Sequence, residues 1–297
     1  MAETAVTEPD SALPLRELAA RHGLSVAGER PTLPRYVRQL WSYRHFILSY
    51  ANAKLVASFS TARLGQLWQV LTPLSNAAVY YLIFGLIIGG SREVNNFIGY
   101  LCTGLFIFIF TSTVVQGGTS SITGNLGLIR ALHFPRAALP IAIMLTQFQS
   151  LIAAVVVLMG IMLATGEPLT VEWLLVLPAL LLQAIFNVGL AMAMARLGAK
   201  LTDLKQVMPF VLRTWMYGSA VLYSVDRFEH LPDNLELVVE SNPLLIYIEL
   251  VRLSLMENVP LGNSPTRLWL LGVAWAVLFG VVGFLYFWRG EQEYGRG

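Results

Sequence analysis

The sequence predicts an all-helical integral membrane protein with six transmembrane helices. Of its 297 residues, 56% are hydrophobic and 13% are charged, whereas a soluble globular protein carries roughly 25% charged residues. The mean hydropathy is +0.62. This small share of charged residues cannot cover a water-facing surface. Much of the surface must therefore face lipid. The net charge of +2, without a basic run that holds interleaved aromatic residues, argues against nucleic acid as a partner.

Six apolar segments are long enough to cross a membrane, which takes about 20 residues at 1.5 Å each. Helices are expected because backbone groups in lipid must find their hydrogen bonds within the segment. The segments are residues 70–88, 97–116, 139–164, 173–195, 207–224 and 268–288. They define a membrane domain over residues 70–288. We expect a mobile cytoplasmic tail over 1–32, an amphipathic interface helix with a linker over 33–69, and a cytoplasmic C-terminal tail over 289–297.

The charges between the segments predict the orientation, because cytoplasmic loops carry an excess of Lys and Arg. With the N-terminus inside, the inner segments hold 15 basic residues and the outer segments hold four. We therefore expect a multi-pass protein of the inner (plasma) membrane, with both termini in the cytoplasm. The single cysteine, Cys102, excludes an intrachain disulfide and a zinc site built from cysteines.

An amphipathic helix is expected before the first span. Leu33, Tyr36, Leu40 and other apolar residues follow helical spacing, and an Arg-rich face lies opposite. Such a helix is typical of one that lies in the headgroup plane. Two interpretations stay open, a membrane anchor and a platform that also contacts a cytoplasmic partner.

The residues that follow resemble a known family. Lys54, then Leu64-Gly65, Leu67-Trp68 and Pro73-Leu74 match by order and spacing the ABC-2 type permeases that export polysaccharides and teichoic acids. Two charged positions of that pattern differ, because Ala51-Asn52 and Ser58-Phe59 stand there.

A second set of matches covers the fifth span and the region after it. It comprises Leu201-Thr202-Asp203-Leu204, Pro209-Phe210-Val211-Leu212, Trp215, Tyr223-Ser224-Val225, Asn242-Pro243-Leu244 and Glu249-Leu250-Val251-Arg252. The resemblance implies a pair of re-entrant outer helices between spans five and six. The similarity is greatest to the Wzm-type permeases, with an actinobacterial galactan exporter as the specific expectation.

The resemblance also implies partners and a cargo. It implies a homodimer that assembles with two copies of an ABC ATPase subunit. The complex would move a lipid-linked polysaccharide of the O-antigen or galactan type to the outer face. ATP and Mg would belong to the ATPase, and this chain would have no cofactor, no metal site and no catalytic residue. The chain has no Gly-Lys pair, so it lacks the loop that cradles nucleotide phosphates.

Two groups of residues are candidates for function. The first would couple to the ATPase and combines the amphipathic helix with the segment between spans two and three, where the family places a coupling helix; its members are Arg35, Arg38, His45, Arg130, His133 and Arg136. A membrane-surface loop with snorkelling arginines is the other interpretation.

The second group would line the substrate channel, because sugar rings pack on aromatic faces while Tyr hydroxyls and Arg bind their oxygens. Its members are Tyr80, Tyr81, Phe84, Arg213, Trp215, Tyr217 and Tyr223. Arg213 is the only charge within a span, so snorkelling towards the cytoplasm competes with a channel position. For the aromatic residues, ordinary bundle packing is the alternative.

Three other functions remain open. A drug or antibiotic exporter would use the same architecture. An ion-coupled carrier is disfavoured because the six segments contain no Asp or Glu, and such carriers depend on intramembrane carboxylates. An integral membrane enzyme that acts on lipid-linked sugars is the third.

Overall fold

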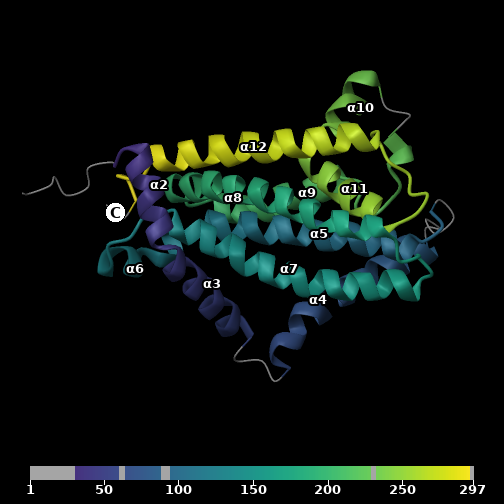
Figure 1. Cartoon of the computed structure of the whole chain (residues 1–297), viewed down its shortest axis with the longest axis horizontal. Coiled ribbons are helices and arrows are strands. Elements are labelled where there is room, and N and C mark those ends of the chain that lie inside the picture. Colours follow the sequence, from purple (N-terminus) through teal and green to yellow (C-terminus); the bar gives the residue numbers. More distant parts are fainter. Residues whose placement is uncertain (1–30, 60–63, 88–93, 229–231, 295–297) are drawn as a thin grey trace, which may run out of the picture.

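The computed structural model describes residues 31–59, 64–87, 94–228 and 232–294, and every regular element within these ranges is a helix. Four helical segments are long and apolar enough to cross a membrane, and they run side by side in Figure 1. They are α5 (Phe97–Thr119), α7 (Ala138–Ala164), α8 (Val176–Lys200) together with the preceding 3-10 helix η6 (Val171–Leu175), and α12 (Pro265–Arg289). These helices confirm the all-helical membrane fold and four of the six predicted segments, with ends that differ by a few residues.

The first predicted span is a helix in two parts. The α-helix α4 (Trp68–Tyr80) continues directly as the π-helix η3 (Tyr81–Ile87). Its bounds agree closely with the predicted range of 70–88. Its apolar stretch is shorter than the four long helices, so its role as a crossing stays a prediction.

The fifth predicted span is shorter than expected. Helix α9 (Leu204–Tyr217) ends at Gly218, and residues 218–224 form a turn in which Ala220 has a φ of 46°. The expected helical end at 224 is therefore wrong. The turn persists because side chains from later in the chain bind its carbonyl oxygens: Asn242 donates to Gly218 O at 2.8 Å, and Arg252 donates to Ala220 O at 3.0 Å.

Two short helices follow this turn, after the 3-10 helix η7 (Val225–Phe228). They are α10 (Asp233–Glu240) and α11 (Pro243–Leu255). Asn242 caps α11 by accepting from the N–H of Leu244 at 3.1 Å, and Pro243 suits its first position. Almost all of α11 is buried. Re-entrant helices were expected here, and whether this pair dips into the membrane stays a prediction.

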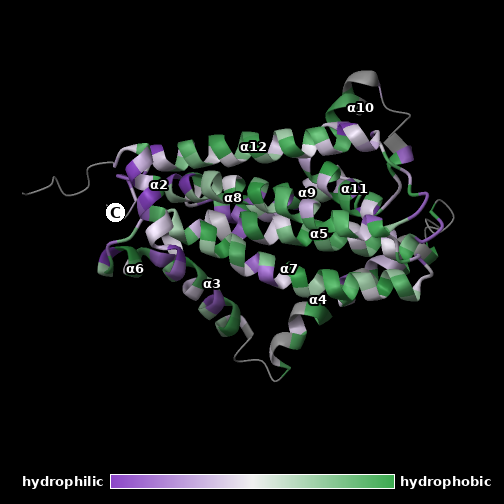
Figure 2. Cartoon of the chain, in the orientation of Figure 1, coloured by the Kyte–Doolittle hydropathy of each residue, from purple (hydrophilic) through white to green (hydrophobic). Residues whose placement is uncertain are grey.

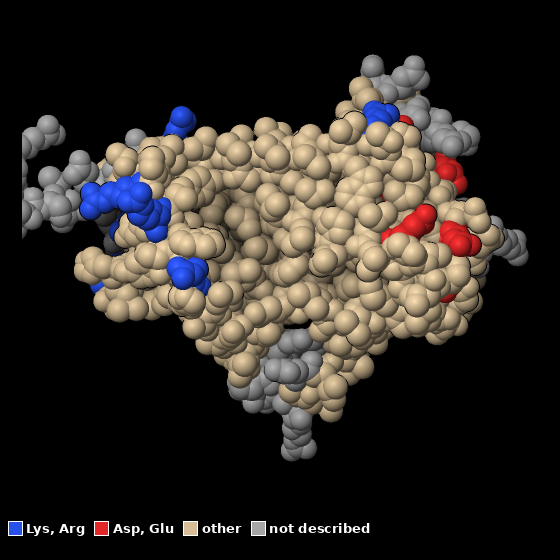
Figure 3. Space-filling model, viewed as in Figure 1, with Lys and Arg blue, Asp and Glu red and all other residues tan. Residues whose placement is uncertain are grey.

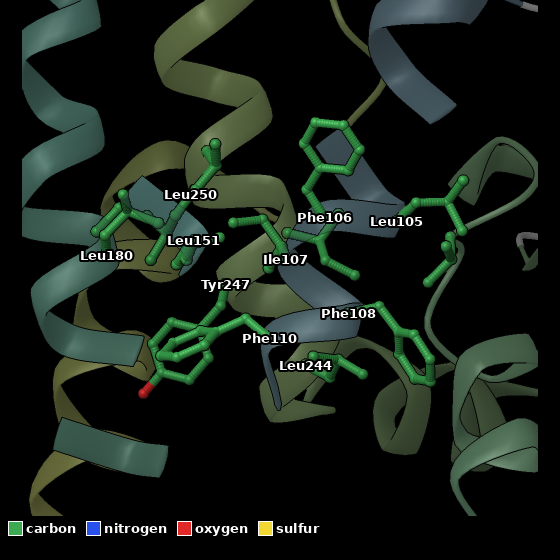
Figure 4. Close-up of a cluster of buried hydrophobic side chains, with 14 of the residues drawn as sticks. Leu105, Phe106, Ile107, Phe108, Phe110, Leu151, Leu180, Leu244, Tyr247 and Leu250 are labelled. Atoms are coloured by element: carbon green, nitrogen blue, oxygen red, sulfur yellow. The ribbon is translucent and has the colours of Figure 1, made fainter. Parts of the chain in front are cut away.

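Helix α5 forms the centre of the bundle. It is buried on nearly all sides by α4, α7, α8 and α11. Figure 4 shows Leu105–Phe108 and Phe110 of α5 in one buried cluster with Leu180 of α8, Leu151 of α7, and Leu244, Tyr247 and Leu250 of α11. A helix that is apolar all round has to be enclosed, and its uniformly hydrophobic sequence fits this central position.

The amphipathic region consists of α2 (Leu33–Ser42) and α3 (Arg44–Phe59). Helix α2 lies at the same end of the bundle as the C-terminus and α6 (Leu126–Ala131), and α3 and α4 diverge from the bundle to form a V (Figure 1). Hydrophilic residues gather at the two ends of the bundle, and a hydrophilic stretch also lies midway along α7 (Figure 2).

Candidate functional site

The two ends of the bundle carry opposite charge. In the face shown in Figure 3, Lys and Arg cluster over the end that holds α2 and α6, while Asp and Glu lie over the end that holds α10. The acidic end includes Glu167 and Glu172 between α7 and α8, and Glu240 at the end of α10. This separation matches the charge asymmetry of the sequence and identifies the basic end as the one expected to face the cytoplasm.

The predicted coupling residues lie at this basic end, but their environments differ. Arg35 and Arg38 on α2, His45 on α3, Arg130 on α6 and His133 after it are all exposed. Arg136 is half-buried instead. Its backbone N–H donates to Glu291 Oε1 at 3.0 Å, and its guanidinium donates to the Glu291 carbonyl oxygen. Arg136 therefore binds the C-terminal segment of its own chain.

Glu291 is the centre of a buried cluster that we call the clasp, made of Tyr36, Arg136, Ala137 and Glu291. The Tyr36 hydroxyl donates to Glu291 Oε2 at 2.7 Å and accepts from the N–H of Ala137 at 3.2 Å. Tyr36 is 1% exposed and Glu291 is 8% exposed. The clasp joins helix α2, the segment before α7 and the segment after α12.

Two further contacts strengthen this assembly. The Tyr43 hydroxyl, between α2 and α3, donates to the His133 carbonyl oxygen at 2.9 Å. The Tyr50 hydroxyl on α3 donates to Asn125 Oδ1 at 2.7 Å, immediately before α6. The two predicted coupling segments thus contact each other directly, and a force on one is transmitted to the other.

The predicted channel aromatics of the first span pack against the bundle. Tyr80 ends α4 and Tyr81 begins η3, and both are half-buried beside the main core. The Tyr81 ring lies 6.4 Å from the ring of Phe97 on α5. The side chain of Phe84 lies outside the part of the chain that the structure describes.

The predicted channel residues of the fifth span separate into two groups. Arg213 and Tyr217 are four residues apart on an exposed face of α9, together with Phe210. Trp215 points the other way and donates its Nε1–H to Asn242 Oδ1 at 2.8 Å. Tyr223 lies in the turn after α9, where its hydroxyl donates to the Tyr217 carbonyl oxygen. Of these four predicted residues of the fifth span, only Arg213 and Tyr217 are exposed in the single chain.

Arg252 of α11 is the most deeply buried cation in the described part of the chain. It is fully buried, and its Nη2 donates to Tyr100 O at 3.1 Å as well as to Ala220 O. Its guanidinium carbon lies 3.3 Å above the ring centre of Tyr100, a cation–π contact. Gly104 leaves room for it, because a Cβ there would come within 2.8 Å of Nη2. Arg252 thus fastens the turn after α9 to α5.

Sequence reasoning missed Tyr36 and Glu291 as functional candidates. The available signal was partial: Tyr36 lies on the predicted apolar stripe, and Glu291 is an acid in a basic cytoplasmic end. Within residues 31–59, 64–87, 94–228 and 232–294, no group of His, Cys, Asp and Glu side chains is arranged to hold a metal ion.

Comparison with known proteins gives a consistent result. Residues 47–256 match the family model for the ABC-2 type transporter. The chain is 27% identical over 195 residues to the O-antigen export system permease protein RfbA of Myxococcus xanthus, which covers 66% of this chain and 74% of that protein. It is 24% identical over 194 residues to RfbA of Klebsiella pneumoniae, covering 65% and 73%. It is 24% identical over 201 residues to the polysialic acid transport protein KpsM of Escherichia coli, covering 67% and 77%.

Proposed function

The chain belongs to the ABC-2 type transporter family, and we propose that it is the permease subunit of an exporter that carries a cell-surface polysaccharide across the inner (plasma) membrane. The observation that carries this proposal is the similarity to O-antigen and polysialic acid export permeases over about two thirds of the chain. The chain is a transport subunit without an ATPase domain. The energy therefore comes from a separate ATPase, and the chain performs no bond chemistry.

The basic end is where we propose that the ATPase subunit binds. Arg35 and Arg38 on α2 and His45 on α3 are exposed there, next to α6. The clasp and the Tyr43–His133 bond tie these helices to the bundle. Movement of a bound ATPase against α2 or α6 would consequently tilt the whole bundle, because these helices cannot move independently of it.

A complete transport unit in this proposal contains two copies of the chain and two of the ATPase. Each copy contributes six crossings. Four are the long helices, and the other two are the α4–η3 segment and the α9 region. Both termini lie in the cytoplasm, and α10 and α11 are the re-entrant pair near the outer face. The exposed face of α9 with Arg213 and Tyr217 supports this arrangement, because a charged and aromatic face needs a wet channel or a partner chain.

The proposed cargo is a lipid-linked polysaccharide, and a galactan is the specific candidate. Tyr80, Tyr81 and Phe84 of the first span, with Arg213, Trp215, Tyr217 and Tyr223 of the fifth, are the proposed contacts. Aromatic faces allow many weak interactions with sugar rings, so that a polymer can slide without a tight trap.

Two measurements test the proposal. First, depletion of the chain leaves the lipid-linked polymer at the cytoplasmic leaflet, whereas an unchanged distribution of polymer across the membrane contradicts the cargo. Second, the purified chain hydrolyses no ATP until the ATPase subunit is added. Resistance to an antibiotic that falls on depletion, with normal polymer at the surface, would favour a drug exporter. Turnover of a lipid-linked sugar by the purified chain alone would favour an enzyme.

A further inference from the structure

A cavity of about 240 Å³ lies between α4, α5 and α7. Each long helix presents one face to it. Phe106, Ile109, Phe110 and Thr113 of α5 follow i, i+3, i+4, i+7 spacing, and so do Gln147, Ser150, Leu151 and Ala154 of α7. Trp68 and Thr72 of α4 complete the wall. Figure 4 shows Phe106, Phe110 and Leu151 among the buried side chains of the core, so the cavity borders the core.

The polar groups of this cavity lie deep in the predicted membrane. Gln147 is nine residues past Ala138, the first residue of α7, which is about 14 Å along the helix axis. The hydrocarbon layer is about 30 Å thick. Gln147 and Ser150 therefore lie near its middle, where an amide or hydroxyl without a partner costs free energy.

The hydrophilic stretch midway along α7 in Figure 2 coincides with this depth. At this depth the α7 sequence holds Thr146, Gln147, Gln149 and Ser150. Two of these side chains turn towards α3: Thr146 donates to Ala51 O at 3.1 Å, and Gln149 donates to Asn52 Oδ1 at 2.6 Å. The other two, Gln147 and Ser150, line the cavity.

Part of the hydrogen-bonding capacity of the cavity is unused by the described part of the chain. Thr113 directs its hydroxyl hydrogen to Ile109 O at 2.8 Å, and Ser150 directs its own to Thr146 O at 3.3 Å. Both oxygens keep lone pairs that can accept. Gln147 forms no hydrogen bond within this part of the chain and offers two donors and an acceptor.

The lining of the cavity is mainly apolar, and its polar groups at Thr72, Thr113, Gln147 and Ser150 give it the mixed character that a sugar ring requires. A cavity of about 150 Å³ already admits a six-membered ring. Trp68, which is 41% exposed, supplies most of the aromatic surface for the C–H face of a sugar, because Phe106 and Phe110 are almost fully buried. Gln147, Thr113 and the other polar groups match its hydroxyls, which both donate and accept. A lipid chain would leave the amide of Gln147 without a partner, whereas the hydroxyls of Thr113 and Ser150 keep their backbone acceptors.

We propose that this cavity is a water-filled site that takes one glycosyl residue of the cargo, an inference that rests on the proposed polysaccharide export. Water occupies the polar wall when no glycan is present. The site lies within a single chain, apart from Arg213 and Tyr217 on the exposed face of α9. Its contacts are neutral, so it selects for hydroxyl groups and not for charge.

Thiol labelling tests whether the cavity holds water. Replacing Cys102, which is buried and free, by Ala gives a chain without cysteine. Ser150→Cys then places a thiol in the cavity. The matched control is Ile152→Cys on the same helix, whose native side chain is 49% exposed away from the cavity and is expected to face lipid. The probe is a water-soluble cationic methanethiosulfonate, which reacts with the thiolate, and a thiol in hydrocarbon stays protonated.

We expect Ser150→Cys to react at least tenfold faster than Ile152→Cys in membranes that contain no polymer. Equal, slow reaction at both positions would show a dry cavity filled by hydrocarbon and would overturn the proposal. This outcome is distinct from failure of the proposed function, because it is measured without cargo and without transport.

A second arm tests the sugar. The same labelling is done in membranes where polymer accumulates because the partner ATPase carries a substitution that stops hydrolysis. Membranes that lack the first sugar-transfer step serve as the comparison. We expect polymer to slow labelling of Ser150→Cys at least threefold. A cavity that reacts quickly but equally with and without polymer holds water only, and the glycan assignment is then wrong.

Substitution of Gln147 separates contact from folding. Gln147→Leu preserves size and removes all hydrogen bonding, so polymer export should fall at least fivefold, and Gln147→Asn should recover part of it. Ile152→Ala is the control at the expected lipid-facing position and should export normally. The thermal midpoint of each purified variant shows whether it folds. If folded Gln147→Leu exports at the normal rate, Gln147 makes no contact with cargo.

Discussion

Tyr36 donates its hydroxyl hydrogen to Glu291 at a distance of 2.7 Å, although 255 residues separate them in the chain. Tyr36 lies on the helix before the first apolar segment, and Glu291 lies just after the last one. The same carboxylate accepts from the N–H of Arg136. One buried side chain therefore holds together the three segments that form the basic end of the bundle.

Replacing Tyr36 by Phe should loosen helix α2. The ring stays, but the carboxylate of Glu291 and the N–H of Ala137 each lose a partner. Leaving a buried group unsatisfied costs about 1–3 kcal/mol. We expect a lower thermal midpoint and faster proteolytic cleavage within α2. Tyr43→Phe is the matched control, because its bond to the His133 carbonyl is exposed. Equal effects of the two substitutions would contradict a special role for the clasp.

The clasp should also make stability depend on pH. Burial raises the pKa of Glu291 above its ordinary value of 4.5, and the hydrogen bonds from Arg136 and Tyr36 oppose this rise without cancelling it. The folded chain therefore binds a proton more tightly than the unfolded chain. The free energy of unfolding falls as the pH rises from 4.5 through the raised pKa. The contribution of Glu291 is complete below this window and lost above it.

Thermal midpoints of the wild-type chain and of Glu291→Gln, taken from about pH 4 to pH 8, check this dependence. The wild type should lose stability relative to the variant as the pH rises. Taking the difference removes the contributions of neighbouring groups such as Glu293 and His133, which are present in both chains. A difference that stays constant over the whole range would show that Glu291 does not titrate in the clasp.

The long helices could be predicted from the sequence because apolar length alone decides them. The end of α9 could not. Residues 218–224 are apolar enough to continue a helix, and the side chains that stop it, Asn242 and Arg252, come from later in the chain. Local pattern carries no information about such long-range partners. The turn after α9 therefore departs from the uniform span that the sequence predicted.

The candidate site was predictable in the same partial way. The charge pattern predicted Arg35 and Arg38 at the basic end, where both are exposed, and their role in coupling stays a prediction. Arg136 belongs to the same pattern, yet it is occupied by Glu291, because the C-terminal segment folds back over it. The polar wall of the α7 cavity escaped notice since Gln and Ser carry no charge and hardly lower the hydropathy of a 27-residue helix.

Coupling to the ATPase should depend on exposed arginines and not on Arg136 alone. Arg38→Glu reverses a charge on the exposed face of α2 and should lower ATPase stimulation by the permease about tenfold while the purified chain keeps its thermal midpoint. Surface charge changes alter stability by less than about 1 kcal/mol. Arg267→Glu is the control at the opposite end, where Arg267 pairs with Glu240 at 3.0 Å. Normal stimulation by Arg38→Glu would remove α2 from the ATPase interface.

The orientation of the bundle can be read from two exposed positions. In the chain with Cys102→Ala, a cysteine at Leu169 lies between α7 and η6 at the acidic end, and a cysteine at Leu132 lies after α6 at the basic end. The positive-inside rule predicts that an impermeant maleimide labels the first in intact cells and the second only after permeabilisation. Labelling of Leu132→Cys in intact cells would reverse the orientation. Labelling of both cysteines in intact cells would place the two ends of α7 on the same side and would contradict a crossing by this helix.

The crossing of α8 and α12 depends on two glycines. A Cβ at Gly189 would lie 1.9 Å from the Phe279 carbonyl oxygen, and a Cβ at Gly283 would lie 2.1 Å from the Gly189 carbonyl oxygen. Small residues at membrane interfaces let helix backbones approach closely. Gly189→Ala should therefore push the helices apart and cost about 3 kcal/mol, as overpacking does in cores.

Gly160 provides the matched control for this crossing. It lies within α7, and a Cβ there would meet nothing within 4 Å. Alanine is a better helix former than glycine by about 1 kcal/mol, so Gly160→Ala should raise the thermal midpoint slightly while Gly189→Ala lowers it strongly. The opposite signs separate close packing from helix propensity. If Gly189→Ala is also neutral or stabilising, the two helices do not touch backbone to backbone at this position.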